Sequence, residues 1–528
     1  MPATALGPSR TRRVPLLRLI PLLPLLPLLA LPAGCGSFFI DAQPPQQAAM
    51  ATATGTATQP RTFAIFLDGT HDDVDHDSNV KRLHAIVALQ ARPELSTLYI
   101  EGVGTGMDAI GAATGAGVGG RVRAAYTHLL RHYHAGDRIV LFGFSRGAYE
   151  ARILASMLQY IGLPDTPPGI ASEPQARDQL VAALYDEMKA GFHDGVPAPT
   201  INRLRTQASG TYHSREIQLL GLWDTVEALG KPEWTSRLLH KAHLGVHTVT
   251  VDELNDRYGD QLLNVRHAVQ AVSMDDDREW IFTPLLITRC HLLMAKPLPG
   301  VSVAPEFKPA PAAAGTAAPA ASALTTTTPP GCPVQRPPGH VIQEVLFPGA
   351  HADVGGGYAD SELSGLSLNW MLGRVRAFAP ELLPANAPLP NVRADATGSS
   401  HDPESAWWKP LYHHVNRNLV GYALAPRPPG PQGRPQAPQN DQVGTLCQHP
   451  SVLKRRQYMP PRTHEFSAWP AGARGRLCAA PDPSVRADPP LWRARPVAEG
   501  GGCDLPGAAL QLTVWDDTAQ TCLPGSPP

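Results

Sequence analysis

The 528-residue chain has almost no net charge, no paired cysteine motif and no long unbroken apolar run. Lys and Arg number 45 against 46 Asp and Glu, so the basic stripe of a nucleic-acid-binding protein is missing and we expect no nucleic-acid partner. The absence of Cys-x-x-Cys disfavours a zinc ribbon. The longest apolar run, "LIPLLPLLPLLALPAG", has 16 residues and several prolines, whereas a spanning helix needs roughly 20 apolar residues.

The N-terminus has the pattern of an export signal. Four arginines (Arg10, Arg12, Arg13 and Arg18) precede the apolar run, which ends in "LPAGC", a sequence that resembles a bacterial lipobox with Cys35 as the lipid acceptor. Residues 1–34 are therefore expected to be a lipoprotein-type signal peptide, although Pro32 stands where such motifs carry leucine. Gly36 is not the aspartate of an inner-membrane retention signal, so we expect an outer-membrane lipoprotein held by its lipid anchor. A soluble periplasmic or secreted protein is the alternative.

The remaining cysteines are even in number, as expected of an exported protein with disulfides. They are Cys290, Cys332, Cys447, Cys478, Cys503 and Cys522. Up to three disulfides are possible, and the spacing leaves their connectivity open.

Apolar runs with strand character alternate with helical patterns from Thr62 onward. This alternation predicts an α/β fold, with a mostly parallel sheet covered by helices on both faces. The expected organisation is a tether (35–61), a catalytic domain (62–470) and a loop-rich, cysteine-containing tail (471–528). Within the catalytic domain we expect a helical cap (163–215), a disordered Pro/Ala/Thr-rich insertion (297–340) and a proline-rich loop (425–440).

The segment "LFGFSRGAYEARIL" contains a Gly-x-Ser-x-Gly pentapeptide between a strand pattern and a helix pattern. This is the setting of a nucleophile elbow, in which a sharp turn leaves no room for Cβ atoms beside the serine. The pattern predicts Ser145 as a nucleophile, with Gly143 and Gly147 as the elbow glycines.

A nucleophilic serine needs a base and a residue that orients the base. Asp224 and His351 follow Ser145 in the chain order of α/β-hydrolases, and each stands at the end of a strand pattern. They are the predicted acid and base. The simpler interpretations are a helix N-cap for Asp224 and a loop histidine for His351.

The oxyanion hole is predicted from the backbone N–H of Arg146 and from Gly69 or Thr70, which follow the first strand pattern. "DGT" here also resembles a phosphotransfer loop, but that loop needs a second aspartate where Phe66 stands.

Two cofactor hypotheses are weaker. A Gly-x-Gly-x-x-Gly match ends the glycine-rich loop at 102–120, but it does not directly follow a strand, and no dinucleotide is expected. The run "THDDVDHDSN" and the downstream "HAD" offer His71, Asp72 and Asp353 as metal ligands, which keeps a metal-dependent hydrolase as a rival. We expect neither a cofactor nor a metal.

Several blocks together resemble a known family. They are "FLDGT", "GVGTG", "GDRIVLFGFSRGAYEAR", "GLWDTVEALG", "FPGAHADVGGGY" and "HPSVLKRR", in this order between Phe63 and Pro460. This arrangement resembles the type VI secretion phospholipase-effector-like domain, a family of bacterial α/β-hydrolases. A further block, "MDDDREWIFTP", resembles a divergent copy of another family motif.

The resemblance implies a lipase or phospholipase with Ser145 as its nucleophile and, by position, Asp224 and His351 as its partners. The substrate would then be a lipid or another acyl ester. Secreted effectors do not resemble a chain with its own lipoprotein signal, so action in the cell's own envelope is expected. An inactive envelope lipoprotein that binds rather than cleaves is the remaining alternative.

Overall fold

The computed structural model describes residues 60–69, 76–90, 92–102, 118–206, 211–226, 261–276, 284–301, 339–401, 445–456 and 514–523, with five short strands between 424 and 496. All of these belong to the compact unit Gln59–Pro528. The predicted signal peptide, Cys35 and the tether lie outside the described residues, as do most of the insertion and most of the proline-rich loop.

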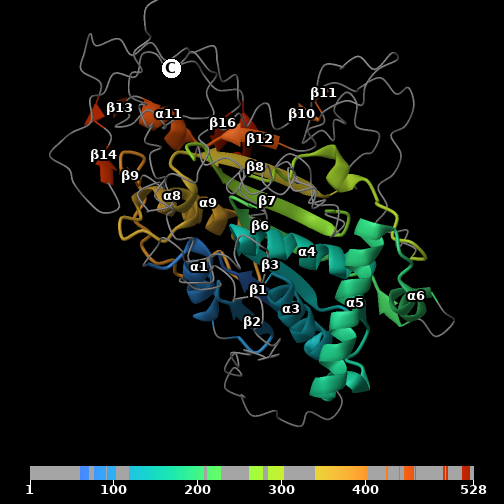
Figure 1. Ribbon diagram of the computed structural model, residues 1–528. Coiled ribbons are helices and arrows are strands. Elements are labelled where there is room, and N and C mark those ends of the chain that lie inside the picture. Colours follow the sequence, from blue (N-terminus) through green and yellow to red (C-terminus); the bar gives the residue numbers. More distant parts are fainter. Residues whose placement is uncertain are drawn as a thin grey trace, which may run out of the picture. The chain divides into compact units, whose positions relative to one another are not determined.

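A nine-stranded sheet forms the centre of this unit (Figure 1). Its order is β17-β16-β12-β8-β7-β6-β3-β1-β2, and every neighbouring pair is parallel except β16 with β17. The strands are β1 (Thr62–Leu67), β2 (Leu95–Ile100), β3 (Arg138–Phe144), β6 (Ile217–Trp223), β7 (Val265–Ser273), β8 (Val341–Phe347), β12 (Thr445–Gln448), β16 (Val514–Asp516) and β17 (Thr521–Leu523).

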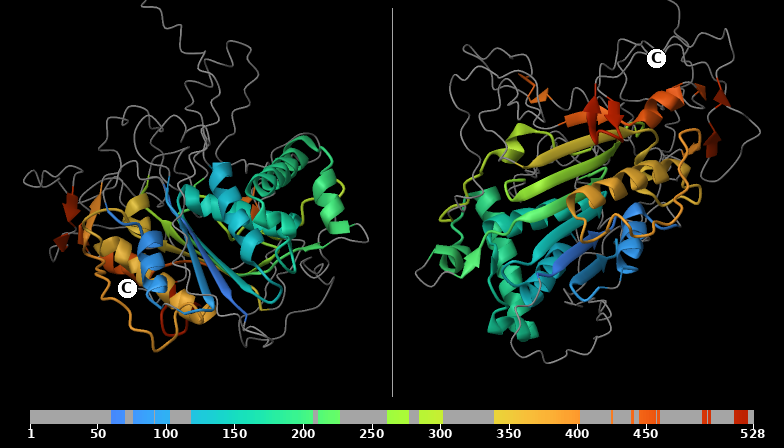
Figure 2. Two further views of the ribbon diagram at one scale, coloured as in Figure 1. Left: turned by 90° about the horizontal axis from the view of Figure 1, so that it is seen from below. Right: turned by 180° about the vertical axis from the view of Figure 1, so that it is seen from behind.

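Helices cover both faces of the sheet (Figure 2). One face carries α3 (Val118–His132), α4 (Arg146–Tyr160) and α5 (Pro174–Asp194), and the other carries α1 (Asn79–Ala88) and α9 (Glu362–Phe378). The shorter helices are α6 (Pro199–Thr206), α8 (His351–Gly355) and α11 (Pro450–Arg456). The predicted α/β fold, with a mostly parallel sheet between helices, is confirmed.

Strand β1 shows why the sequence folds this way. Phe63, Ile65 and Leu67 belong to the apolar cluster of α3 and α4, while Ala64 and Phe66 belong to that of α1 and α9. Successive side chains of a strand point to opposite faces, so a strand covered on both faces must be apolar throughout. This explains the unbroken apolar runs in the sequence.

Residues 163–215, predicted to be a cap with one helix, contain α5, α6 and a short antiparallel pair formed by β4 (Leu163–Pro164) and β5 (Tyr212–His213) at the two ends of the segment. Leu184 and Met188 of α5 are buried in the same apolar cluster as α3 and α4. The segment therefore thickens one helical layer. Helix α6 was not predicted because it is only eight residues long and largely polar.

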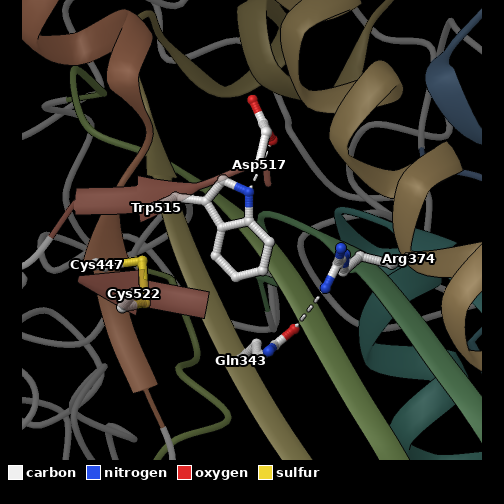
Figure 3. Close-up of a disulfide and its surroundings, with 6 residues drawn as sticks. All are labelled: Gln343, Arg374, Cys447, Trp515, Asp517 and Cys522. Atoms are coloured by element: carbon white, nitrogen blue, oxygen red, sulfur yellow. Dashed lines mark hydrogen bonds between the residues drawn. A yellow bond between two sulfur atoms is a disulfide. The ribbon is translucent and has the colours of Figure 1, made fainter. Parts of the chain in front are cut away.

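The C-terminal region contributes to the main sheet through β16 and β17. A disulfide joins Cys447 of β12 to Cys522 of β17, with 5.9 Å between the Cα atoms (Figure 3). Beside it, the Arg374 guanidinium of α9 lies 4.6 Å from the Trp515 ring centroid. Cys290 is disulfide-bonded as well.

The remaining short strands pair in twos: β10 (Leu424–Ala425) with β11 (Gln439–Asn440), β13 (Tyr458–Met459) with β15 (Arg495–Pro496), and β9 (Ser399–His401) with β14 (Leu491–Arg493). Among the helices that the structure describes, none is both long and apolar enough to cross a membrane.

Candidate active site

Ser145 occupies a sharp turn between β3 and α4. It has φ 56° and ψ −126°, a backbone conformation that is uncommon for a residue with a side chain. Its N–H donates to the Trp223 carbonyl of β6 (3.0 Å), and its own carbonyl accepts the Ala148 N–H (3.1 Å). A strained conformation held by its neighbours is typical of a functional position.

The two glycines of the pentapeptide are required by the backbone that surrounds them. A Cβ atom on Gly147 would lie 2.1 Å from the Leu67 carbonyl oxygen, and one on Gly143 would lie 2.5 Å from the Ala148 Cα. Real Cβ atoms do not approach so closely. The turn is thus packed against the end of β1 and the first turn of α4, which matches the geometry predicted for a nucleophile elbow.

Asp224 and His351, which are 127 residues apart in the chain, are hydrogen-bonded to each other. His351 Nδ1 lies 2.6 Å from Asp224 Oδ2, and both residues are buried. Asp224 follows β6 and His351 begins α8 just beyond β8, at the same carboxyl edge of the sheet as Ser145. Because Nδ1 faces the carboxylate, it carries the proton, and Nε2 is the ring nitrogen left to act as a base.

The carboxylate of Asp224 is fixed by the neighbouring strand. Its second oxygen, Oδ1, accepts the Ser273 N–H (2.9 Å), and the Asp224 N–H donates to the Ala271 carbonyl (2.7 Å). Asp224 also has a positive φ of 38°. The alternative interpretation of Asp224 as a helix N-cap does not fit the described residues, because Thr225 and Val226 directly after it are not helical.

The Phe144 ring lies between the elbow and the histidine. Its centroid is 4.7 Å from that of the His351 imidazole, and a Cβ on Gly355 of α8 would collide with it. Ser145 follows Phe144 directly and, like His351, is only 5% exposed. The three predicted catalytic residues thus lie at one edge of the sheet, at the ends of β3, β6 and β8.

The loop after β1 lies against Ser145, as predicted for an oxyanion loop. A Cβ on Gly69 would be 3.0 Å from the Ser145 Cβ. The Gly69 N–H, however, donates to Asp68 Oδ1 (2.7 Å), because an aspartate side chain readily folds onto a nearby backbone amide. Thr70 lies outside the described residues, and Arg146 is the first residue of α4.

Sequence reasoning assigned no role to the network that holds this loop. Asp68 Oδ2 accepts hydrogen bonds from the Ser78 hydroxyl (2.7 Å) and the Tyr99 hydroxyl (2.6 Å). Next to Ser78, Asn79 donates to the Val354 carbonyl of α8 (2.9 Å). The end of β1 is therefore connected to the helix of His351. The only sequence signal was the motif "FLDGT…SNV".

Of the alternative metal site, only Asp353 lies among the described residues, and its carboxylate is already engaged. Asp353 accepts two backbone N–H groups and bonds to His401 Nδ1 at 2.6 Å, while His71 and Asp72 fall outside the described residues. Among residues that the structure does describe, no group of three or more His, Cys, Asp or Glu side chains is arranged to hold a metal ion.

Comparison with known proteins gives relatives with limited overlap. An uncharacterised protein of Saccharomyces cerevisiae is 29% identical over 112 residues, which are 20% of this chain and 15% of that protein.

Two solved structures are also similar. One is an uncharacterized protein from Pseudomonas aeruginosa (17% identity, TM-score 0.29, 63% of this chain and 48% of that one). The other is a Tle1 effector bound to the VgrG spike of the type VI secretion system (18% identity, TM-score 0.26, 57% of this chain and 51% of that one). The chain thus spans about half of each of these structures.

The family comparison covers more of the chain. The family model described as "T6SS, Phospholipase effector Tle1-like, catalytic domain" matches residues 61–374 of 528. The match contains the elbow, Asp224 and His351, and it ends within α9, short of the C-terminal blocks up to Pro460. The chain belongs to the family of type VI secretion, Tle1-like phospholipase effector catalytic domains.

Proposed function

We propose that this protein is an exported serine hydrolase of the lipase or phospholipase type, which cleaves carboxylic esters of lipids. The observation that carries the proposal is the 2.6 Å bond between Asp224 and His351 at the strand edge that also bears the strained Ser145. Membership of a phospholipase effector family supports the lipid class of substrate.

In the proposed mechanism, the Ser145 hydroxyl oxygen attacks the ester carbonyl carbon. His351 takes the serine proton through Nε2 and passes it to the leaving alcohol, and Asp224 holds the imidazole and stabilises its charged form. Water then attacks the acyl-enzyme with His351 again as the base, which releases the fatty acid and restores Ser145.

The oxyanion of each tetrahedral intermediate needs backbone donors close to Ser145. The first is the N–H of Arg146, because the N–H groups of the first helical turn have no acceptor within the helix. The second comes from the loop after β1. There, either Thr70 donates, or the Gly69 N–H exchanges Asp68 Oδ1 for the oxyanion.

Export and a lipid anchor at Cys35 are part of the proposal. The Cys447–Cys522 disulfide supports an oxidising compartment, since cytosolic proteins rarely keep structural disulfides. An outer-membrane anchor would hold the enzyme at a lipid surface. Labelling cells with radioactive palmitate tests this, because a Cys35→Ser variant should lose the label and leave the membrane fraction.

The hydrolase proposal is tested with a fluorophosphonate probe on purified protein that lacks residues 1–35. The wild type should be labelled and should release fatty acid from phospholipid vesicles, whereas a folded Ser145→Ala variant should do neither. Labelling that persists in Ser145→Ala would place the nucleophile elsewhere. A folded but unlabelled wild type would favour the binding lipoprotein, and activity lost to chelators alone would favour the metal-dependent hydrolase.

A further inference from the structure

The turn that leads into α8 has an unusual set of hydrogen-bond partners. Its three consecutive backbone N–H groups each donate to the carboxylate of a different aspartate. The pairs are Gly349 to Asp275 (2.6 Å), Ala350 to Asp353 (3.1 Å) and His351 to Asp276 (3.2 Å). We refer to Asp275, Asp276 and Asp353 as the carboxylate cradle.

All three carboxylates of the cradle are buried, with exposures of 1%, 1% and 2%. A buried carboxylate is costly unless hydrogen bonds satisfy it, and bonds from backbone N–H groups to a charged acceptor are stronger than neutral ones. Asp275 and Asp276 come from the segment after β7, and Asp353 belongs to α8 itself. The cradle therefore fixes the end of β8 to the end of β7.

The backbone of the turn is confined in other ways as well. Gly349 has a φ of +103°, and a Cβ there would lie 2.4 Å from the Asp353 Cβ. The Asp275 N–H donates back to the Gly349 carbonyl (3.2 Å), so these two residues are joined by a pair of bonds. The imidazole of His351 extends from a segment whose main chain has little freedom to move.

His401 adds a further contact to Asp353, one of the three cradle residues. Its Nδ1 lies 2.6 Å from Asp353 Oδ1, and its N–H donates to Asp353 Oδ2 (3.0 Å). The Tyr358 ring stacks on the His401 imidazole with 3.8 Å between centroids. Strand β9, which ends at His401, is thereby tied to the turn before His351.

We propose that the carboxylate cradle consists of positioning residues for His351: it holds the backbone at 349–351 so that the imidazole keeps its bond to Asp224 at the sheet edge that bears Ser145. This inference rests on the proposed function. A general base must stand within hydrogen-bond reach of its proton, and a misplacement of about 1 Å can cost about 100-fold in rate. None of the three aspartates touches the substrate in this scheme.

Asp276 gives the sharpest test, because it holds the His351 N–H directly. Asp276→Ala removes the acceptor, whereas Asp276→Asn keeps a carbonyl oxygen at the same place. We expect Asp276→Ala to lower kcat and the rate of fluorophosphonate labelling by about 100-fold with KM little changed. Asp276→Asn should retain at least about a tenth of the wild-type rate.

Asp137 provides the matched control. Its side chain is also mostly buried, and like Asp276 it accepts backbone N–H groups, in this case from Arg61 and His134 (both 2.8 Å). It stands before the first residue of β3, roughly 25 Å from Ser145 along the strand. Asp137→Ala should lower the melting temperature but leave kcat and labelling unchanged.

The outcomes separate the cradle from the proposed function. If the wild type is labelled at Ser145, a folded Asp276→Ala variant with wild-type kcat would show that the cradle does not position His351. Equal losses in Asp276→Ala and Asp137→Ala would lead to the same conclusion, since they reflect general destabilisation. If the wild type is not labelled, the proposed function fails. Amide hydrogen exchange then tests whether the cradle restrains the backbone at 349–351, because exchange there should rise in Asp276→Ala and stay unchanged in Asp137→Ala.

Discussion

Arg121 of α3 and Glu150 of α4 form a buried ion pair, with Nη1 and Oε1 3.2 Å apart. The other terminal nitrogen of Arg121 donates to the Asp68 carbonyl, at the end of β1 (2.5 Å). That carbonyl and the Gly69 N–H belong to one peptide group, so the ion pair and the Asp68 carboxylate hold the two sides of the same peptide. The loop beside Ser145 is thus fixed through helices on one face of the sheet.

The first prediction concerns pH and Glu150. Burial raises the pKa of Glu150 to about 7 from 4.5, although Arg121 and Arg146 oppose the shift. The folded protein then binds more protons than the unfolded chain between these values, so its stability falls as the pH rises from about 4.5 to about 7. The contribution is present below pH 4.5 and amounts to about 3 kcal/mol of unfolding free energy.

Glu150→Gln should flatten this slope, as measured by urea unfolding from pH 5 to 8. Glu216→Gln is the control, because Glu216 forms a partly exposed pair with Arg266 (3.0 Å) and should leave the slope as in the wild type. An unchanged slope in Glu150→Gln would show that Glu150 does not titrate in this range.

The second prediction concerns the elbow. Gly147→Ala would place a Cβ 2.1 Å from the Leu67 carbonyl, so β1 or α4 must shift, and we expect a loss of about 3 kcal/mol in stability and of most labelling at Ser145. Gly120→Ala is the control, because Gly120 lies inside α3 and a Cβ added there would have no other atom within 4 Å. It should stabilise the protein by about 0.5–1 kcal/mol and leave labelling intact. Thermal unfolding and labelling of both variants check this.

Sequence patterns predicted the strands that precede Ser145, Asp224 and His351 because each is mostly apolar and the residue in question follows it within a few positions. Strand β7 was not predicted, since Arg266, His267 and Gln270 interrupt it. In the fold, the His267 ring stacks on Phe378 with 4.2 Å between centroids, and Gln270 donates to Glu344 (2.6 Å). These partners come from distant segments, which local patterns do not reveal.

The roles of Asp275 and Asp276 were missed for the same reason. In the sequence they stand in a run of three acidic residues, which is typical of a solvated loop. They are buried only because β8 pairs with β7 and places the turn at 349–351 beside them. The turn at Ser145 was predictable because its motif is local, whereas the groups that hold the turn before His351 depend on sheet order.

The third prediction concerns the orientation of the base. Asp224→Asn would present an amide to His351 Nδ1 and favour the wrong tautomer, with Nε2 protonated and unable to accept the serine proton. We expect kcat to fall by about 10⁴-fold with binding of the ester little changed. Single-turnover acylation measures the step directly. A loss below about tenfold in a folded variant would mean that Asp224 does not orient the base.

The last prediction concerns the disulfide on the β17 side of the sheet. Cys447 and Cys522 are 75 residues apart, and opening a loop of that length in the unfolded chain should cost about 4 kcal/mol of stability in the entropic model. The bond joins β12 and β17, whereas Ser145, Asp224 and His351 follow β3, β6 and β8. A Cys447→Ser, Cys522→Ser double variant should therefore unfold at lower urea concentration but be labelled at the wild-type rate under native conditions. If labelling fell as well while the variant remained folded, the C-terminal strands would be contributing to the site as well as to stability.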